Sequence, residues 1–424
     1  LLLCHTRLSI LDLSLQGHQP KQSLSKRYVI SFNGEIYNHQ FLRSLCPNNY
    51  GFSGTSDTET ILALLDTYGF SEIVHLLDGM FALAVWDSVS KKLYLTRDRF
   101  GEKPLYWGFT SLFGTRSLCF TSDLDAIFSF KPFSLGDIDH ESLHSFFSYG
   151  FIPSHKSIHK SYSQVLPGTY LTFSQDSLIC EPEITHYWSP LSPVSFERQK
   201  FDSTYEHAVT HLDDLLTNSV SSKLISDVPL GCFLSGGIDS SLIASIYSQY
   251  STNPITTLNL SFPDHEDEYF DEGSYASSVA TFLGSNHHQL KLSSSSFVSN
   301  ISSVLSSYSE PFSDLSQLPT YLISEFAAQL GLKVVLSGDG GDELFGGYNR
   351  HIFAYFFQKS GLHKSSYLTS VLSSFLAYSN TSSKDLSQSS LSKLVNALSC
   401  DSHPYNLYNT LLKRVDSANI LNIP

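Results

Sequence analysis

The sequence predicts two different folds in one chain. The first half is predicted to be α+β, with layered, mostly antiparallel sheets and helices, and the second half to be α/β, with a doubly wound parallel sheet. Up to about residue 200, short strand-like runs follow one another, separated by turn residues. After residue 201, strands and helices alternate instead. The 424 residues suffice for two or three domains, and we expect them at 1–135, 136–200 and 201–424.

The composition is that of a globular protein, with 41% hydrophobic and 13% aromatic residues. A net charge of −14 argues against a general nucleic-acid binder. The six cysteines lack paired metal-ligand spacing, which favours a reduced, cytoplasmic protein. No apolar run approaches the roughly 20 residues that span a bilayer, so we expect no membrane association. The chain starts at Leu1 rather than Met and ends without a closing element, and we interpret it as a fragment.

Strand-like runs cover residues 1–5, 28–32, 81–86, 93–96 and 118–121 of the first half, and residues 86–93 resemble a hairpin turn with its flanks. The apolar spacing of residues 58–68 predicts a helix, capped by Ser56 or Asp57. Residues from about 123 to 200 are interpreted as a connecting region, because prolines and serines gather before residue 200.

Polar residues interrupt this pattern at Arg7, at Asn33-Gly34-Glu35 after an apolar strand, and at Asp57. Each has an ordinary interpretation, as a surface charge, a turn or a helix cap. Together they predict an amino-acid pocket. Arg7 can bind an α-carboxylate through two hydrogen bonds, and Glu35 and Asp57 can bind an α-ammonium group. The Asn33 side chain and the Gly34 N–H can form an oxyanion hole.

In the second half, strands are predicted before the loop at 235–240 and at 255–262, 288–292 and 333–337, with helices at 205–224, 272–283 and 318–330. The first of these helices carries one apolar face, formed by Ala208, Leu212, Leu215, Leu216 and Val220. Ligands of such sheets bind at the carboxyl ends of the strands. We therefore expect the 235–240 loop, Leu260 and Ser337-Gly338 to converge.

The loop at 235–240 reads SGGIDS and lies between an apolar strand and a helical pattern. Its glycines let several N–H groups face one point, and the helix N-terminus adds unsatisfied donors, so the loop is suited to phosphate. The alternative is an ordinary strand-to-helix turn. Asp239 makes sense there if a divalent metal accompanies the phosphates. The run resembles the loop of enzymes that split ATP into AMP and pyrophosphate, rather than a Walker loop.

A second loop, at 337–348, reads SGDGGDELFGGY and crowds Asp339, Asp342 and Glu343 together. Such crowding favours a bound cation, and a plain acidic surface loop is the alternative. The acidic run at 264–272 is predicted to be a solvated loop. The serine-rich run at 365–399 is predicted to form exposed helices.

Several runs resemble the class II glutamine amidotransferase domain of the glutamine-hydrolysing asparagine synthetases: HTRLSI at 5–10, FNGEIYN at 32–38, SDTE at 56–59, LDGMFA at 77–82 and RDRFGEKPLY at 97–106. Residues 158–170 resemble the closing hairpin of that domain, and the loop at 337–348 resembles a run of the synthetase domain.

The resemblance implies glutamine binding by Arg7, Leu8, Ser9, Ile10, Leu11, Asn33, Gly34, Glu35 and Asp57. It implies ATP binding by Phe233, Ser235, Gly236, Gly237, Asp239, Ser240, Leu260, Ser337 and Gly338. Asp239 and Asp342 would bind Mg²⁺.

The nucleophile of the family is a cysteine at position one after Met removal, upstream of the Arg-Leu-Ser run, and we expect it to be absent from this chain. Cys4 lies in a predicted strand without a free amine and is no candidate. The fragment is therefore expected to hydrolyse no glutamine. Residues 413–416, KRVD, match a family lysine motif only with the spacing one residue off, and that lysine is expected beyond Pro424.

The implied reaction is the glutamine- and ATP-dependent amidation of aspartate to asparagine through an acyl-adenylate, with ammonia passed between two sites in an enzyme that could form a homodimer. Asp339 would assist formation of the intermediate and accept a proton, although many relatives have Glu there. Asp is one methylene shorter, which sets the acceptor back by about 1–1.5 Å. Alternatives are a β-lactam synthetase, which the intact glutamine pocket disfavours, a sugar-acid amidotransferase, or a non-catalytic paralogue.

Overall fold

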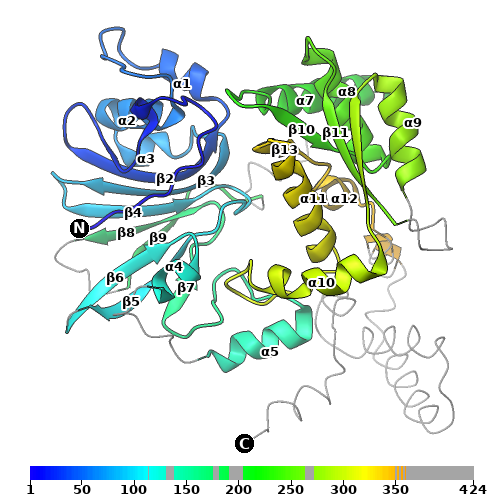
Figure 1. Ribbon diagram of the computed structural model, residues 1–424. Coiled ribbons are helices and arrows are strands. Elements are labelled where there is room, and N and C mark those ends of the chain that lie inside the picture. Colours follow the sequence, from blue (N-terminus) through cyan, green and yellow to red (C-terminus); the bar gives the residue numbers. More distant parts are fainter. Residues whose placement is uncertain are drawn as a thin grey trace, which may run out of the picture. The chain divides into compact units, whose positions relative to one another are not determined.

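The computed structural model describes residues 1–112, 114–129, 138–174, 181–190, 204–262 and 272–348, with a few positions between 351 and 359. The chain forms two compact units. The first contains Leu1–Asp139, Pro153–Glu310 and Ser316–Ser337, and the second contains His140–Ile152, Pro311–Leu315 and Gly338–Pro424. All the described strands lie in the first unit (Figure 1).

Two antiparallel sheets form the first half of the chain. In the larger sheet Asp87 pairs with Lys92, so the predicted hairpin is confirmed. Its strand order is β1 (Lys21–Gln22), β2 (Tyr28–Ile36), β3 (Gly79–Asp87), β4 (Lys92–Arg97), β8 (Thr169–Ser174), β9 (Glu183–His186). The smaller sheet has the order β6 (Thr115–Thr121), β5 (Tyr106–Leu112), β7 (Tyr162–Gln164).

These sheets are layered with helices. One face of the larger sheet, with Ile30 and Leu83, packs against the helices α1 (His39–Ser44), α2 (Asp57–Tyr68) and α3 (Phe70–Ile73). Its other face, with Leu95, packs against Trp107 of the smaller sheet. The helix α4 (Leu124–Phe128) covers the remaining face of that smaller sheet. The predicted layered α+β fold is confirmed.

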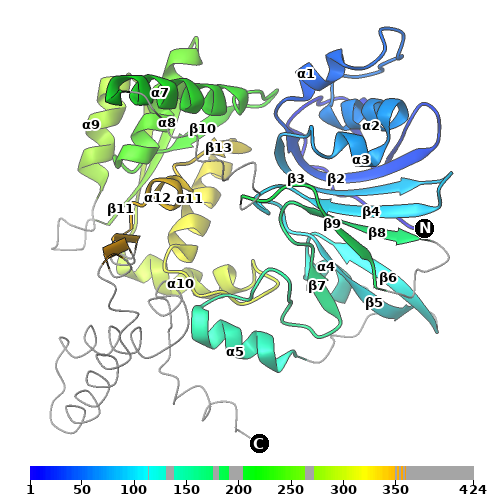
Figure 2. The same cartoon turned by 180° about the vertical axis from the view of Figure 1, so that it is seen from behind.

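The predicted doubly wound parallel sheet is also present, with the order β12 (Asn286–Lys291), β11 (Thr256–Ser261), β10 (Leu230–Phe233), β13 (Val334–Leu336). Alternate residues of β10 face opposite sides of the sheet. Cys232 packs with α8 (Ile238–Tyr250) and α9 (Gly273–Leu283), whereas Phe233 packs with α11 (Gln317–Gln329). Helices therefore cover both faces (Figure 2).

Three local predictions were wrong. Residues 1–9 form no strand, and Leu1 and Leu2 are exposed rather than packed against a partner strand. Residues 33–35 lie inside β2 and not after it, because β3 continues the pairing to Ile36. Residues 158–170 form no hairpin, since β7 pairs with β5 and β8 pairs with β4 and β9.

The helix predicted at 205–224 exists as α7 (Tyr205–Ser222), but most of its apolar face is not buried. Val220 is buried, whereas Leu212 and Leu215 are 40% and 54% exposed. The elements not yet named are the short helix η1 (Leu15–Gly17), α5 (His140–Tyr149), α10 (Ser294–Leu305) and α12 (Gly341–Phe345).

Among the described residues, no helix combines the length and the apolar character that crossing a membrane requires. Three features of the sequence lie outside the described residues: the acidic run at 264–272 apart from Glu272, the serine-rich run at 365–399, and residues 413–416.

Candidate active site

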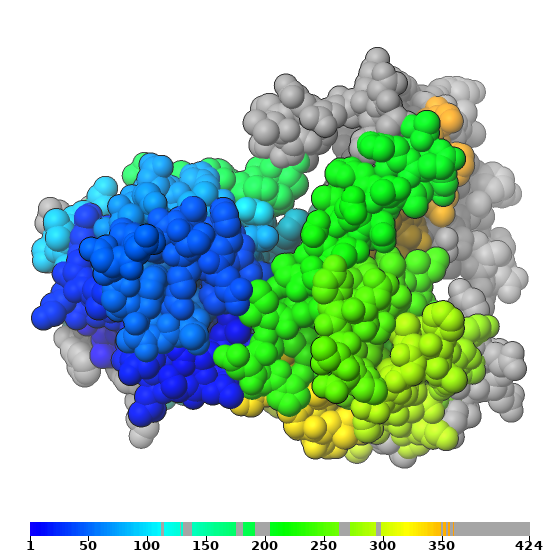
Figure 3. Space-filling view, turned by 90° about the horizontal axis from the view of Figure 1, so that it is seen from above, coloured from blue at the N-terminus to red at the C-terminus, as the bar shows by residue number. Residues whose placement is uncertain are grey.

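A pocket opens in the first unit where the N-terminal loop, β2 and the start of α2 meet. The N-terminal segments that surround it are the blue surface of Figure 3. Eight of the nine residues predicted to bind glutamine line the pocket, and Ser9 is the exception. The lining residues among them are Arg7, Leu8, Ile10, Leu11, Asn33, Gly34, Glu35 and Asp57. Sequence reasoning missed His5, Thr6, Gln19, Phe32, Ser56, Thr58, Met80 and Lys103.

Gly34 is required because the paired strands β2 and β3 lie very close together at this position. Its φ is 150°, and a Cβ at this position would lie 2.0 Å from the carbonyl oxygen of Met80. Only glycine lets the two strands approach this closely. The glycine thereby places Asn33 and Glu35, on either side of it, along the pocket wall.

The guanidinium of Arg7 is held by the backbone of its own loop. It donates hydrogen bonds to the carbonyl oxygens of Leu11 and Ser14, both at 2.9 Å, and to that of Asp12. A guanidinium carries five N–H donors, so two remain for a ligand in the pocket. Arg7 is thus oriented before any carboxylate arrives.

Two carboxylates, those of the half-buried Glu35 and the buried Asp57, line the same pocket. Burial raises the pKa of Glu35, and the charge of Asp57 raises this pKa further. Burial also raises the pKa of Asp57, although N–H groups of Ile36 at 3.0 Å and Thr58 at 2.7 Å donate to it. The Oε2 of Glu35 is buried without a hydrogen-bond partner among the described residues. The pair is therefore short of a cationic donor, which an ammonium group would supply.

Cys4 precedes the pocket residue His5 but contributes nothing to the lining. Its side chain is an exposed free thiol. The structure therefore does not place Cys4 where it could attack a ligand in the pocket.

The loop at 235–240 has the geometry expected of an anion site. The Ser235 hydroxyl accepts a hydrogen bond from Gly237 N–H at 3.2 Å and lies 2.9 Å from the Ser240 hydroxyl. Gly236 has a φ of 84°. The N-cap of α8, Gly237, has no side chain, so no side-chain cap occupies the first N–H groups of this 13-residue helix. Those N–H donors therefore point out of the N-terminal end of α8, toward the space in front of the loop.

The predicted convergence at the carboxyl ends of the strands is present within the first unit. β10 lies between β11 and β13, and Phe233 packs with Leu260. Ser337 directly follows β13 at the same edge. Gly338, Asp339 and Asp342 belong to the second unit, which is described by itself.

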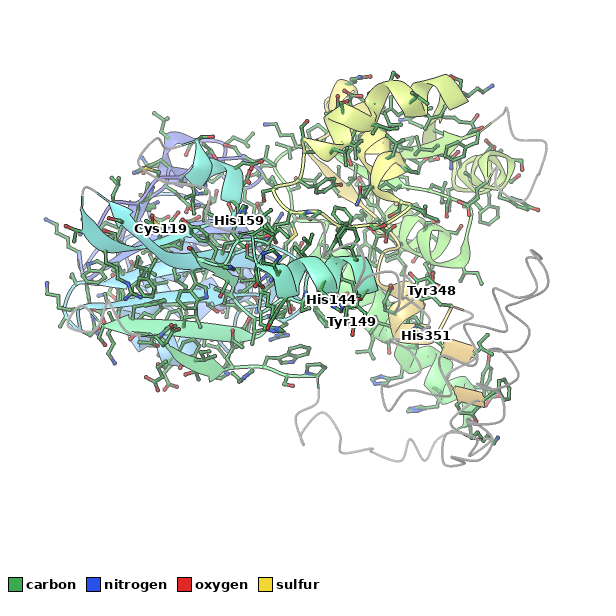
Figure 4. The ribbon with its side chains drawn as sticks, turned by 90° about the horizontal axis from the view of Figure 1, so that it is seen from below. Cys119, His144, Tyr149, His159, Tyr348 and His351 are labelled. Carbon is green, nitrogen blue, oxygen red and sulfur yellow. The ribbon has the colours of Figure 1, made fainter. Side chains whose placement is uncertain are left out.

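In the second unit, the acidic loop folds into the short helix α12 between two glycines of positive φ, Gly340 and Gly346. The Tyr348 hydroxyl donates to Glu343 at 2.9 Å, and its ring meets that of His351 edge-on at 5.4 Å between centroids (Figure 4). A Cβ on Gly347 would lie 1.8 Å from a carboxylate oxygen of Asp342, so a larger residue there would displace the Asp342 side chain.

The residues proposed for magnesium suit that ion chemically. Asp239 and Asp342 offer hard carboxylate oxygens, and neither forms an ion pair within the described part of the chain. No group of three or more His, Cys, Asp or Glu residues there could hold a metal ion. One or two carboxylates are what a protein usually gives Mg²⁺ when phosphates and water complete its shell.

The chain matches two protein families. The family described as "Glutamine amidotransferase domain" matches residues 1–188, and that described as "Asparagine synthase" matches residues 211–412. A putative glutamine-hydrolysing asparagine synthetase 2 of Methanocaldococcus jannaschii is 33% identical over 368 residues, covering 83% of this chain and 67% of the relative.

Two further relatives show the range of names in this group. Glutamine-hydrolysing asparagine synthetase 1 of Bacillus subtilis is 33% identical over 344 residues, covering 81% of this chain and 51% of the relative. "Amidase chyE" of Penicillium rubens is 30% identical over 356 residues, covering 81% and 51%. The chain thus spans between half and two thirds of the length of these relatives.

Proposed function

Because the chain belongs to the family of glutamine-hydrolysing asparagine synthetases, we propose that the whole protein uses glutamine and ATP to convert aspartate into asparagine. The observation that carries this proposal is a single pocket lined by Arg7 and by the two carboxylates of Glu35 and Asp57. A guanidinium and a carboxylate pair complement the two charged groups of a free amino acid.

In the first site, Arg7 holds the α-carboxylate of glutamine, and Glu35 and Asp57 hold its ammonium group. The side-chain amide then points toward Asn33 and Gly34, which stabilise the oxyanion formed when a thiol attacks the amide carbon. Attack forms a carbon–sulfur bond and releases ammonia, and water then returns glutamate. Cys4 has no role in this step.

In the second site, the loop at 235–240 and the N-terminus of α8 hold the phosphates of ATP, with Phe233, Leu260, Ser337 and Gly338 around the nucleotide. An oxygen of the acceptor carboxylate attacks the α-phosphorus, and pyrophosphate leaves. Adenylation is needed because a free carboxylate is a poor electrophile. Ammonia from the first site attacks the acyl-adenylate, AMP leaves, and Asp339 takes the surplus proton. Mg²⁺ bound by Asp239 and Asp342 would offset the charge of the pyrophosphate.

A screen of the full-length protein for pyrophosphate release with different carboxylates tests the proposal. We expect AMP and pyrophosphate to form in a reaction that requires aspartate, and Asp239→Ala to abolish it. Asp213→Ala is the matched control, because Asp213 lies exposed on α7. Formation of ADP, or release of AMP at the same rate without any acceptor, would contradict the proposal.

The second candidate is the same chemistry on another carboxylate. It is favoured by Asp339, which stands where many of the resembling synthetases carry Glu, and by a relative named as an amidase. In the same screen this enzyme would release pyrophosphate with a different acceptor and would release none with aspartate.

A further inference from the structure

Glu310 joins the two halves of the chain inside the first unit. It follows α10 in the sequence, yet its carboxylate accepts three hydrogen bonds from the amidotransferase half. The donors are the Tyr106 hydroxyl at 2.8 Å, the Ile158 N–H at 2.6 Å and the Gln164 side-chain amide at 3.1 Å.

The donors make this contact specific. Tyr106 and Ile158 are 8% and 7% exposed. All three donors are neutral, so the contact depends on their directions rather than on attraction between opposite charges. Without the carboxylate, two buried donors would lose their partner.

A chain of hydrogen bonds continues from Glu310 to the wall of the glutamine pocket. The carbonyl oxygen of the Gln164 side chain accepts from Arg97 at 3.2 Å. Arg97 is itself buried and donates to the backbone carbonyl of Lys103 at 2.7 Å. Lys103 lines the pocket.

On its other side, Glu310 is tied to the nucleotide-binding half through the sequence. It lies between α10 and α11, and α11 packs against β11, the strand that carries Leu260. The carboxylate is thus connected to the wall of one site by hydrogen bonds, and to the sheet that carries the other site through the chain that leads into α11.

We propose that Glu310 is a positioning residue that couples the release of ammonia from glutamine to its use in the second site. The inference rests on the proposed function. A shift of the segment around Glu310 would leave each site able to work, but would let ammonia escape before it is used.

The test measures glutamate and pyrophosphate in the same reaction of the full-length protein. The ratio of glutamate to pyrophosphate rises when ammonia is released without being used. We expect a ratio near one for the wild type, and a rise of about threefold or more in Glu310→Ala, since a charged acceptor of buried donors is lost. With ammonium chloride in place of glutamine, pyrophosphate release by Glu310→Ala should fall by less than about twofold, because the second site remains intact.

Two further variants separate positioning from general stability. Glu310→Gln keeps the shape and one side-chain oxygen, so the ratio should lie between those of the wild type and Glu310→Ala. Glu325→Ala removes an exposed carboxylate from α11 and should keep the wild-type ratio.

An unchanged ratio in Glu310→Ala would overturn the inference, as would a parallel loss of the glutamine- and ammonia-driven reactions. Failure of the proposed function itself would be visible in the wild type, which would then release no pyrophosphate with ammonium chloride.

Discussion

At the scale of single residues, Glu35 and Asp57 lower the stability of the folded protein by an amount that depends on pH. The folded state raises the pKa of Glu35 above its value of about 4.3 in an unfolded chain. Folded protein then binds more protons than unfolded protein over the interval between the two values, so stability falls as pH rises through it. Asp57 contributes with the same sign.

Replacing Glu35 with Gln should remove the part of this pH dependence that comes from Glu35. We expect Glu35→Gln to melt at a higher temperature than the wild type at pH 8, by a few degrees, and nearly equally at pH 5. The same variant should lose glutamine binding in calorimetry, because the ammonium group loses an anionic partner. Glu72→Gln, on the exposed side of α3, is the control. Equal melting temperatures of Glu35→Gln and wild type at pH 8 would show that burial of Glu35 carries no penalty.

At the residue scale, the sequence predicted that Arg7, Glu35 and Asp57 share one pocket, and all three line it. The signal was that each is a charged residue interrupting the apolar pattern of the first half. Gln19 could not be predicted, because an amide in a polar loop gives no sign of which surface it will face. Lys103 lies within one of the runs that resemble the family, and that was the only signal for it.

At the scale of elements, the loop at 235–240 is fixed by its contact with α9. A Cβ on Gly236 would lie 2.6 Å from the Cβ of Tyr275 and 2.7 Å from the Ala276 nitrogen. Because Gly236 also has a φ of 84°, both backbone conformation and space exclude other residues.

Gly236→Ala should therefore destabilise the protein by about 2–4 kcal/mol and abolish ATP binding. Gly284→Ala is matched to it, because Gly284 ends α9 with a φ of 63° and no described residue lies within 4 Å of a Cβ there. It should cost only about 1 kcal/mol and leave ATP binding intact. Urea unfolding and nucleotide titration measure both effects, and equal losses in the two variants would refute the steric argument.

Helices were predicted well where a capping residue in the sequence marks the helix end. Ser56 caps α2 by accepting from the Glu59 N–H, and Gly284 closes α9 in the left-handed conformation. The strand expected at residues 1–5 and the hairpin at 158–170 were wrong, because strands are stabilised by partners elsewhere in the chain. Local sequence does not specify that β7 and β8 join different sheets.

At the scale of the whole molecule, a second link between the two halves lies close to the glutamine pocket. Asp227, shortly before β10, accepts from the Asp12 N–H at 2.8 Å and donates its own N–H to the Ile10 carbonyl at 3.1 Å. Asp12 has a φ of 54°, a costly conformation outside glycine, and its carbonyl helps to hold Arg7. The link therefore stabilises the loop that orients Arg7.

We expect Asp227→Ala to raise the KM for glutamine by about fivefold, since a charged hydrogen bond is lost at a site that water can reach. Glutaminase assays of the full-length protein measure this effect, with Asp213→Asn as the exposed control. A KM equal to that of the wild type would show that Asp12 keeps its conformation without Asp227.

The division into an α+β and an α/β half could be predicted because strand–helix alternation is a local pattern that persists over many residues. The links at Asp227 and Glu310 could not. Each joins residues more than a hundred positions apart, and nothing near either acid marks it as different from a surface carboxylate.

The presence of Arg7, Glu35 and Asp57 in one pocket also bears on which form of glutamine this pocket would accept. Both charged groups that it recognises exist together only in the free amino acid. In a glutamine residue inside a polypeptide, the ammonium and carboxylate groups have been converted into peptide bonds. Such a residue would present two neutral amides to the Arg7 guanidinium and to the carboxylates of Glu35 and Asp57. The pocket would thus bind free glutamine and would not bind glutamine side chains of other proteins.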